Sequence, residues 1–336
     1  LQNASPILSG CLRIRQEVVS NTIMTLEHHL QQLTKEDVHS KHSLLVHLSS
    51  LNDEEMEQFR AWWPSLPSEQ RHKLIERLAT VAEDNVEMDF SAIFRHCLTD
   101  DYSKVREIAV SGLWECDDHK LVDPLMTLAK NDPSQEVRIS AVLALGKFGA
   151  LAESRKLLPR NGERIKETLL FLLEDEQGTV EIRRRALEAV ASFNTPRVRE
   201  LIRWAYDSPD IKLRTSALYA MGRTGDPTWL PTLINEMGNK EQAMRYEAAC
   251  ACGEMGDEEA VPYLITLIQD EDLQVQLAAI RAMGVIGSPL AKRALLRCVK
   301  SGDEPLQDAA REALQQLEVE ENPLRFNYQP FRDSNQ

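Results

Sequence analysis

A motif returns at a fixed interval through most of this chain. The stretch "LRTSALYAMGRTGD" begins at Leu213, and "MRYEAACACGEMGD" begins 31 residues later at Met244. Seven positions align in this register, with these two among them: Val105, Val137, Ile182, Leu213, Met244, Val275 and Leu306. The last four steps are identical, and a period of 20 to 50 residues is typical of a solenoid of stacked repeats.

Each repeat carries small residues at helical spacing. Alanine stands four residues after every starting position, as at Ala217 and Ala248. Alanine or glycine follows three residues later, so both small residues lie on one helix face and allow a neighbouring helix to approach closely. Gly225 and Gly256 stand twelve residues after the start, where a glycine can end a helix in the left-handed conformation. A second apolar helix follows, so each repeat is predicted to be helix, turn, helix.

This pattern resembles the HEAT repeats, an armadillo-like class, and within them the short phycobilisome-lyase-like subclass of bacterial type. The stretches "VRISAVLALGKFG" and "VQLAAIRAMGVIGS" carry the resemblance as clearly as the two quoted above. It implies an all-α, right-handed α-solenoid of helix-turn-helix repeats. An arginine follows the starting residue in five repeats, and these structural arginines are Arg106, Arg138, Arg183, Arg214 and Arg245. In the family an aspartate near the helix start commonly pairs with this arginine, which implies pairs with Asp101, Asp132 and Asp210.

The periodicity divides the chain into four parts. We expect a flexible leader over residues 1–22, an N-terminal helical cap over 23–99, the repeat array over 100–320 and an extended tail over 321–336. The array holds about seven units, with 14 extra residues inserted near 150–165. The pair Trp62 and Trp63 is predicted to pack within the cap.

Charge and composition exclude several classes of protein. The formal net charge is -14, which disfavours nucleic acid as the main partner because phosphate binding needs a basic surface. No apolar run reaches the ~20 residues of a membrane span, so we expect no membrane span and a cytoplasmic location. The six cysteines are scattered over 336 residues, unlike a secreted disulfide scaffold.

No catalytic motif is present. H-E-x-x-H, G-x-S-x-G, the P-loop and G-x-G-x-x-G are all missing from the sequence. The deoxyhypusine hydroxylases, which share the repeat, hold two irons with His-Glu dyads, and this chain contains no His-Glu dipeptide. The sequence therefore predicts neither catalytic residues nor a bound metal or cofactor.

The predicted function is a non-enzymatic scaffold or adaptor that binds another protein on the concave surface of the solenoid. The second helices are expected to line that surface, through two rows of residues: Trp204, Asn235, Thr266 and Arg297 in one, and Leu201, Thr232 and Tyr263 in the other. One alternative, implied by the resemblance, is a bilin or tetrapyrrole lyase or cofactor carrier. Another is anion or nucleic-acid binding through the region from Arg155 to Arg203. From Glu153 to Arg203 the chain contains eleven basic and nine acidic residues.

Overall fold

The computed structural model describes residues 26–35, 42–300 and 303–321, and every regular element among them is a helix. The expected leader and tail fall outside these residues, apart from residue 321. The chain divides into two compact units, unit 1 up to Pro124 and unit 2 from Leu125. No helix in the described ranges is long and apolar enough to cross a membrane.

Unit 1 contains the predicted cap and the first repeat helix. Its helices are α2 (Leu26–Lys35), α3 (His42–Val46), α4 (Asp53–Trp62), η2 (Trp63–Ser65), α5 (Ser68–Asp84), α6 (Ser91–Cys97), α7 (Ser103–Gly112) and η3 (His119–Leu121). Asn52 caps α4 in a capping box with Glu55, which satisfies backbone donors at the helix start. Trp63 is buried and its indole Nε1 donates to the Asp100 carboxylate at 2.6 Å. Trp62 is partly exposed and lies edge-on to Trp63.

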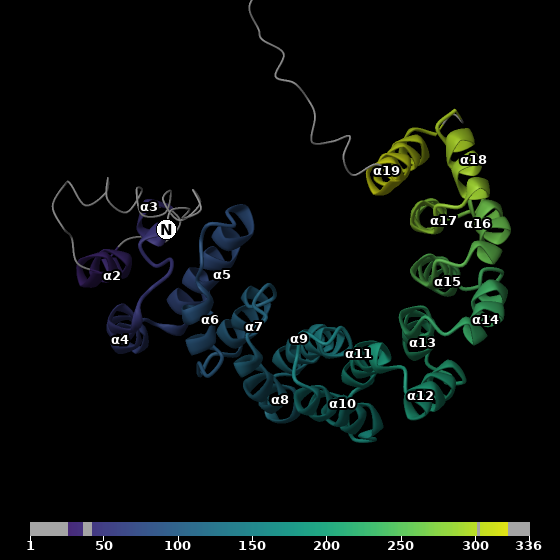
Figure 1. Ribbon diagram of the computed structural model, residues 1–336. Coiled ribbons are helices and arrows are strands. Elements are labelled where there is room, and N and C mark those ends of the chain that lie inside the picture. The colour runs from purple at the N-terminus through teal and green to yellow at the C-terminus, as the bar shows by residue number, and fades with distance from the viewer. Residues whose placement is uncertain (1–25, 36–41, 301–302, 322–336) are drawn as a thin grey trace, which may run out of the picture. The chain divides into compact units, whose positions relative to one another are not determined.

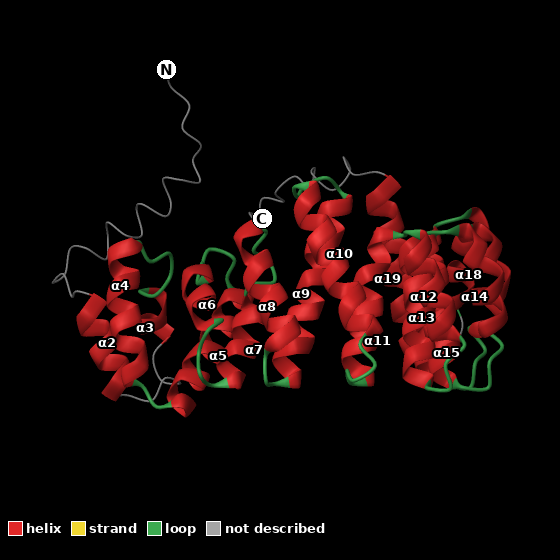
Figure 2. Ribbon diagram, turned by 90° about the horizontal axis from the view of Figure 1, so that it is seen from below, coloured by secondary structure: helices red, strands yellow, loops and turns green. Residues whose placement is uncertain are grey.

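Unit 2 is built from two layers of helices (Figures 1 and 2). The first helices of the repeats are α9 (Gln135–Glu153), α11 (Val180–Val190), α13 (Ile211–Thr224), α15 (Gln242–Met255), α17 (Leu273–Ile286) and α19 (Glu304–Glu321). The second helices are α8 (Val122–Asn131), which begins at the unit boundary, α10 (Pro159–Glu174), α12 (Pro196–Tyr206), α14 (Leu230–Glu236), α16 (Val261–Leu267) and α18 (Pro289–Cys298). Short helices η4 (Ala191–Phe193), η5 (Pro227–Trp229) and η6 (Glu258–Ala260) join the layers. The predicted all-helical solenoid is confirmed.

Glycine and alanine join successive first helices. A Cβ placed on Gly222 of α13 would lie 2.7 Å from the Cα of Ala251 on α15. The same relation recurs one repeat later, where a Cβ on Gly253 would lie 2.8 Å from the Cα of Ala282. Real Cβ atoms do not come so close, so only glycine permits this spacing. The first helices are therefore in backbone contact along the array.

This close spacing decides which layer faces inward. Helices packed through glycine and alanine approach more closely than helices packed through larger side chains, so the array bends towards the first-helix layer. Within unit 2, helices α13, α15 and α17 lie on the inner side of the curve, and α14, α16 and α18 lie on the outer side (Figure 1). The prediction that the second helices line the concave surface is wrong, because the small-residue contacts belong to the first helices.

The ends of the first helices follow the predicted glycine positions. Gly225 ends α13 with a φ of 62°, and Gly256 ends α15 with a φ of 71°, both in the left-handed region. In the repeat of α11 the same position is Asn194, with a φ of 39°. Asparagine tolerates this conformation better than other residues that carry a Cβ. The turn is therefore conserved in geometry although its residue changes.

The repeat arginines bind backbone carbonyls. Arg138 donates from Nε to the carbonyl of Ala129 at 3.0 Å, and Arg183 donates to Leu173 at 3.2 Å. These carbonyls lie in the last turn of the preceding second helix, where no intrahelical donor is available. Arg245 reaches the carbonyls of residues 239 and 240 and also forms a bidentate pair with Asp270, at 2.7 and 2.9 Å.

Two of the aspartates expected to pair with these arginines, Asp101 and Asp210, make further contacts. Asp210 caps α13, and its Oδ1 accepts from the backbone N–H groups of Lys212 and Leu213. The Asp101 carboxylate accepts from Arg71, and Arg106, the arginine of the same repeat, donates to the Asp101 backbone carbonyl. An aspartate immediately before a helix is a favourable N-cap, and that local role is met here.

The inserted residues near 150–165 are helical. α9 has 19 residues where α13 has 14, and α10 has 16 residues where α14 has 7. The insertion therefore lengthens both helices of one repeat, as Figure 2 shows for α10. Gly149 occupies the position of Gly225, but it lies inside α9 because the helix continues beyond it.

Candidate functional site

The inner face of unit 2 is the strongest candidate for a binding site. We define it as the side of α11, α13, α15 and α17 that points away from the second helices. Tyr219 of α13 is 43% exposed on the first-helix layer, and Val285 of α17 is 59% exposed. Exposed apolar and aromatic side chains of this kind are enriched at protein interfaces.

Two arginines and two glutamates form a closed charge cluster on α11. Arg184 contacts Glu181 at 2.7 Å and Glu188 at 3.0 Å, and Arg185 contacts the same Glu188 at 2.8 Å. Ser216 of α13 donates its hydroxyl to Glu188 Oε1 at 2.5 Å, which links the cluster to the next helix. Each charge in this cluster has an opposite partner, so the cluster is electrically balanced.

Glu247 of α15 differs from this cluster. It stands at the same repeat position as Ser216, three residues after the start of its repeat. Burial and the nearby Glu188 carboxylate raise its pKa to about 7, while the Arg184 guanidinium acts in the opposite direction. No residue in the described part of the chain donates a hydrogen bond to its carboxylate. Glu247 is therefore a half-buried acid whose carboxylate receives no hydrogen bond from the described residues.

A cavity of about 330 Å³ opens beside Glu247. Its walls come from the first two turns of three successive first helices, and the lining residues are Thr215, Gln242, Ala243, Tyr246, Glu247 and Gln274. Apart from Ala243, all of these side chains can form hydrogen bonds. We call this cavity the Glu247 pocket.

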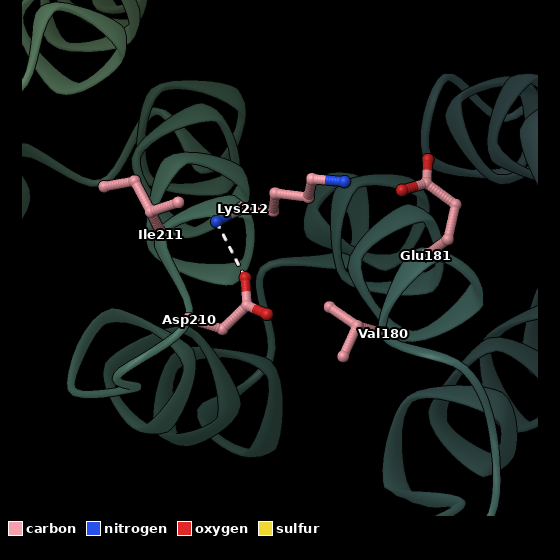
Figure 3. A pocket seen from close by; sticks show the side chains of 5 residues that line it. All are labelled: Val180, Glu181, Asp210, Ile211 and Lys212. Carbon is pink, nitrogen blue, oxygen red and sulfur yellow. Dashed lines mark hydrogen bonds between the residues drawn. The ribbon is translucent and has the colours of Figure 1, made fainter.

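A second cavity, of about 270 Å³, lies between α11 and α13. Val180 and Glu181 line it from one helix, and Asp210, Ile211 and Lys212 line it from the next (Figure 3). The Asp210 carboxylate is held by the backbone N–H of Lys212, as the dashed line in Figure 3 shows. The Asp210 carboxylate therefore serves as the N-cap of α13, and the cavity is a gap between the N-termini of two neighbouring helices.

The residues predicted to contact a partner lie on the second helices, in the outer layer. Trp204 and Tyr263 are 43% and 49% exposed, and Asn235, Thr266 and Arg297 are also exposed. Leu201 is buried at 7%, which removes it from any surface, and Thr232 is half-buried. The structure therefore brings the first row together as an outer row, and the predicted place of both rows on the concave surface is wrong.

The basic region between Arg155 and Arg203 is largely compensated by its own neighbours. Arg197 contacts Glu174 at 2.7 Å and Glu200 at 3.0 Å, in addition to the closed cluster on α11. The Arg183 guanidinium lies 4.9 Å from the centre of the Trp204 ring, a cation-π contact. These paired cations weaken the hypothesis that the region binds a polyanion.

Cysteines and metal ligands offer no further site. Burial raises the pKa of Cys250 to about 11 and that of Cys252 to about 12, so both thiols are neutral at pH 7. Among the described residues, no group of three or more histidine, cysteine, aspartate or glutamate side chains could hold a metal ion.

The reasoning from sequence missed Ser216, Tyr219 and Glu247. The signal that could have found them is the contrast between fixed and variable positions. Four and seven residues after each start the chain requires small residues, whereas three and six residues after it the residue changes from repeat to repeat. Of these variable residues, Tyr219 is exposed, Glu247 is half-buried and Ser216 is buried. The choice of layer was the error that hid them.

The two layers of stacked helices in unit 2 place the chain in the class of α-solenoid repeat proteins. The profile of the HEAT repeats matches residues 91–161, 166–240 and 230–315, which is more than half of the chain. The chain belongs to the HEAT-repeat family, and the resemblance predicted from the repeat motif is confirmed. A comparison with curated proteins finds no match.

Solved structures with related folds are only distantly similar. The complex of CpcE and CpcF of phycocyanin lyase from Nostoc sp. PCC7120 is 20% identical, covering 57% of this chain and 75% of that chain with a TM-score of 0.41. Human deoxyhypusine hydroxylase in complex with glycerol is 17% identical, covering 87% and 97% with a TM-score of 0.34. Kap121p is 15% identical, covering 90% and 36% with a TM-score of 0.41. These low scores show a distant likeness in fold and carry no functional argument.

Proposed function

We propose that this protein is a non-enzymatic scaffold that binds another protein on the inner face of unit 2. The observation that supports it best is the exposed Tyr219, which stands beside charged groups on a continuous layer of first helices. Stacked repeats present such a layer as one extended surface. Tyrosine combines a large apolar ring with a polar tip, and tyrosines of this kind are frequent among the residues that dominate binding energy.

Repeat architecture alone does not select a partner, because such arrays serve many functions. The selection must come from positions that differ between repeats. On the inner face these include the positions of the exposed Tyr219 and the half-buried Glu247, whereas the buried Ser216 acts between helices and the alanines and glycines set the helix spacing. The balanced charges on α11 and the partnerless acid on α15 give the two halves of this surface different chemistry.

The test compares two exposed tyrosines in different layers. Tyr219 lies on the inner face and Tyr263 on the outer layer, with similar exposures of 43% and 49%. Proteins captured from the native cell by the wild type, by Tyr219→Arg and by Tyr263→Arg are quantified by mass spectrometry. We expect Tyr219→Arg to lose the captured partner about tenfold or more, while Tyr263→Arg retains it. Retention by Tyr219→Arg together with loss from Tyr263→Arg would move the binding surface to the outer layer.

A further inference from the structure

The Glu247 pocket is an open hollow in the surface with a carboxylate in its wall. Its volume of about 330 Å³ far exceeds the ~10–15 Å³ needed to hold one water molecule. Thr215 reaches it from α13 and Gln274 from α17, while Tyr246 and Glu247 belong to α15. Three helices fixed by backbone contact therefore position the lining groups, and the pocket exists without a partner to shape it.

The electrostatics of the pocket favour a cation. Arg184 is the attractive charge nearest to Glu247, but its guanidinium is already bound to Glu181, Glu188 and Ser216. The Glu188 carboxylate repels the Glu247 carboxylate. A cation that entered the pocket would supply the missing partner, and pairing favours ionisation of a buried acid.

The lining groups suit an ammonium or guanidinium group better than a simple hydrated ion. The side chains of Gln242, Gln274 and Thr215 each offer an acceptor oxygen, and lysine and arginine carry several donors that need acceptors. The neighbouring surface agrees, because residues 240–320 contain 8 basic and 15 acidic residues. A basic segment is therefore drawn towards this half of the array by its overall field.

We propose that the Glu247 pocket binds the cationic head group of a lysine or arginine in a basic segment of the partner protein. The inference rests on the proposed function, since it names the chemistry of the partner on the same inner face. It makes Glu247 the residue that selects for a basic side chain, with Gln242 and Gln274 orienting the bound head group.

The probe is a fluorescein-labelled peptide of alternating Gly-Ser-Lys units, and its uncharged counterpart carries acetyl-lysine. Binding to the full chain is measured by fluorescence anisotropy at pH 8 and low salt. We expect the lysine peptide to bind the wild type, and Glu247→Gln to weaken it about tenfold, as for loss of a hydrogen bond to a charged group. The acetyl-lysine peptide should bind the wild type as weakly as the lysine peptide binds Glu247→Gln.

The matched control is Glu254→Gln on the same helix. Glu254 is exposed and pairs with Arg223 at 2.6 Å, so the substitution removes the same charge from outside the pocket. We expect it to change the affinity less than twofold, because exposed pairs contribute little. Equal weakening by Glu254→Gln and Glu247→Gln would show a general charge effect and overturn the pocket, as would absence of peptide binding to the wild type.

The pH dependence supplies a second readout. A cation binds the ionised carboxylate, so affinity for the lysine peptide should fall as the pH drops through about 7, where Glu247 takes up a proton. In Glu247→Gln this fall should disappear. The charged and titratable groups around Glu247 that could contribute are Glu188 and Arg184 on α11, Tyr219 on α13, Tyr246 and Cys250 on α15, and Arg281 on α17.

The two proposals fail separately. A captured partner that is lost from Tyr219→Arg but binds Glu247→Gln as tightly as the wild type would overturn the pocket and leave the scaffold function standing. Circular dichroism and the melting temperature establish that each variant is folded. Glutamine has the shape of glutamate, so Glu247→Gln is not expected to disturb packing.

Discussion

The two helix layers of unit 2 solve different problems. In the first-helix layer, glycine and alanine bring neighbouring backbones into contact, as between Gly222 and Ala251. In the outer layer, larger groups lie against one another, as where the Arg203 guanidinium lies 5.2 Å from the centre of the Trp229 ring. The first-helix layer sets the spacing and the bend of the array. The outer layer packs against its convex side.

This difference shows where a repeat protein can vary. Small residues between the first helices cannot change without moving a backbone, so function must use the positions beside them. Ser216 and Glu247 occupy the same position in successive repeats, and one is bound into the cluster on α11 while the other faces a cavity. A single position thus changes the chemistry of the inner face while the fold stays constant.

The largest expected effect comes from filling the contact between first helices. Gly222→Ala places a Cβ 2.7 Å from a backbone atom of α15, so the two helices must separate. We expect a loss of about 2–3 kcal/mol in unfolding free energy, as for overpacked cores. Urea unfolding followed by circular dichroism measures the change.

Gly238 provides the matched control, because it follows the outer helix α14. A Cβ there would meet only the carbonyl oxygen of Asn235, at 3.6 Å. Gly238→Ala should leave stability unchanged or raise it by about 0.5 kcal/mol, through reduced freedom of the unfolded chain. If both variants lost stability equally, the layers would not differ in the way that the structure indicates.

Sequence alone could predict the repeat and its spacing because each unit repeats the same packing requirement. Ala217 and Gly225 recur on a fixed period, and a period is visible in one chain without comparison to others. The layer that faces inward depends on small differences in helix separation between the two layers. The separation between helices results from many contacts, such as the one between Gly222 and Ala251. No single residue in the sequence predicts it.

The second prediction concerns Glu247 and pH. Its pKa is raised from 4.5 to about 7, so the folded state prefers the protonated acid. The stability contributed by this preference is fully present below pH 4.5 and is lost as the pH rises through 7. At pH 8 the wild type should therefore be less stable than Glu247→Gln by about 2 kcal/mol, allowing for partial exposure of the carboxylate.

Chemical unfolding of both proteins at pH 5 and pH 8 measures this difference. The variant should gain its advantage mainly between these two values, because glutamine does not titrate. An equal gap at both pH values would mean that Glu247 is ionised throughout, and that the pocket does not hold a partnerless acid. The site was harder to foresee than the fold for the same reason: its pKa depends on Glu188 and Arg184, which are distant in sequence.

The third prediction compares the residues that precede the first helices of two neighbouring repeats. Asp210 caps α13 through two backbone N–H groups, whereas Glu241, at the same place before α15, makes no such cap. Asp210→Ala should cost about 1 kcal/mol, and Glu241→Ala should cost almost nothing. Thermal unfolding of the two variants provides the comparison, and similar losses in both would assign Asp210 a role other than capping.

The last prediction concerns Gly225, three residues after Gly222, where asparagine should cost less than any other disruptive change considered above. A Cβ on Gly225 would meet nothing within 4 Å, so this residue is glycine for its φ of 62° and not for space. Gly225→Ala should cost about 1 kcal/mol, the penalty of the left-handed conformation. Gly225→Asn should cost about half as much, because Asn194 already takes this conformation at the same position of another repeat. Equal costs for alanine and asparagine would show that the side chain at this turn meets an obstacle. In that case the close packing between first helices would extend beyond Gly222 to the turn at Gly225.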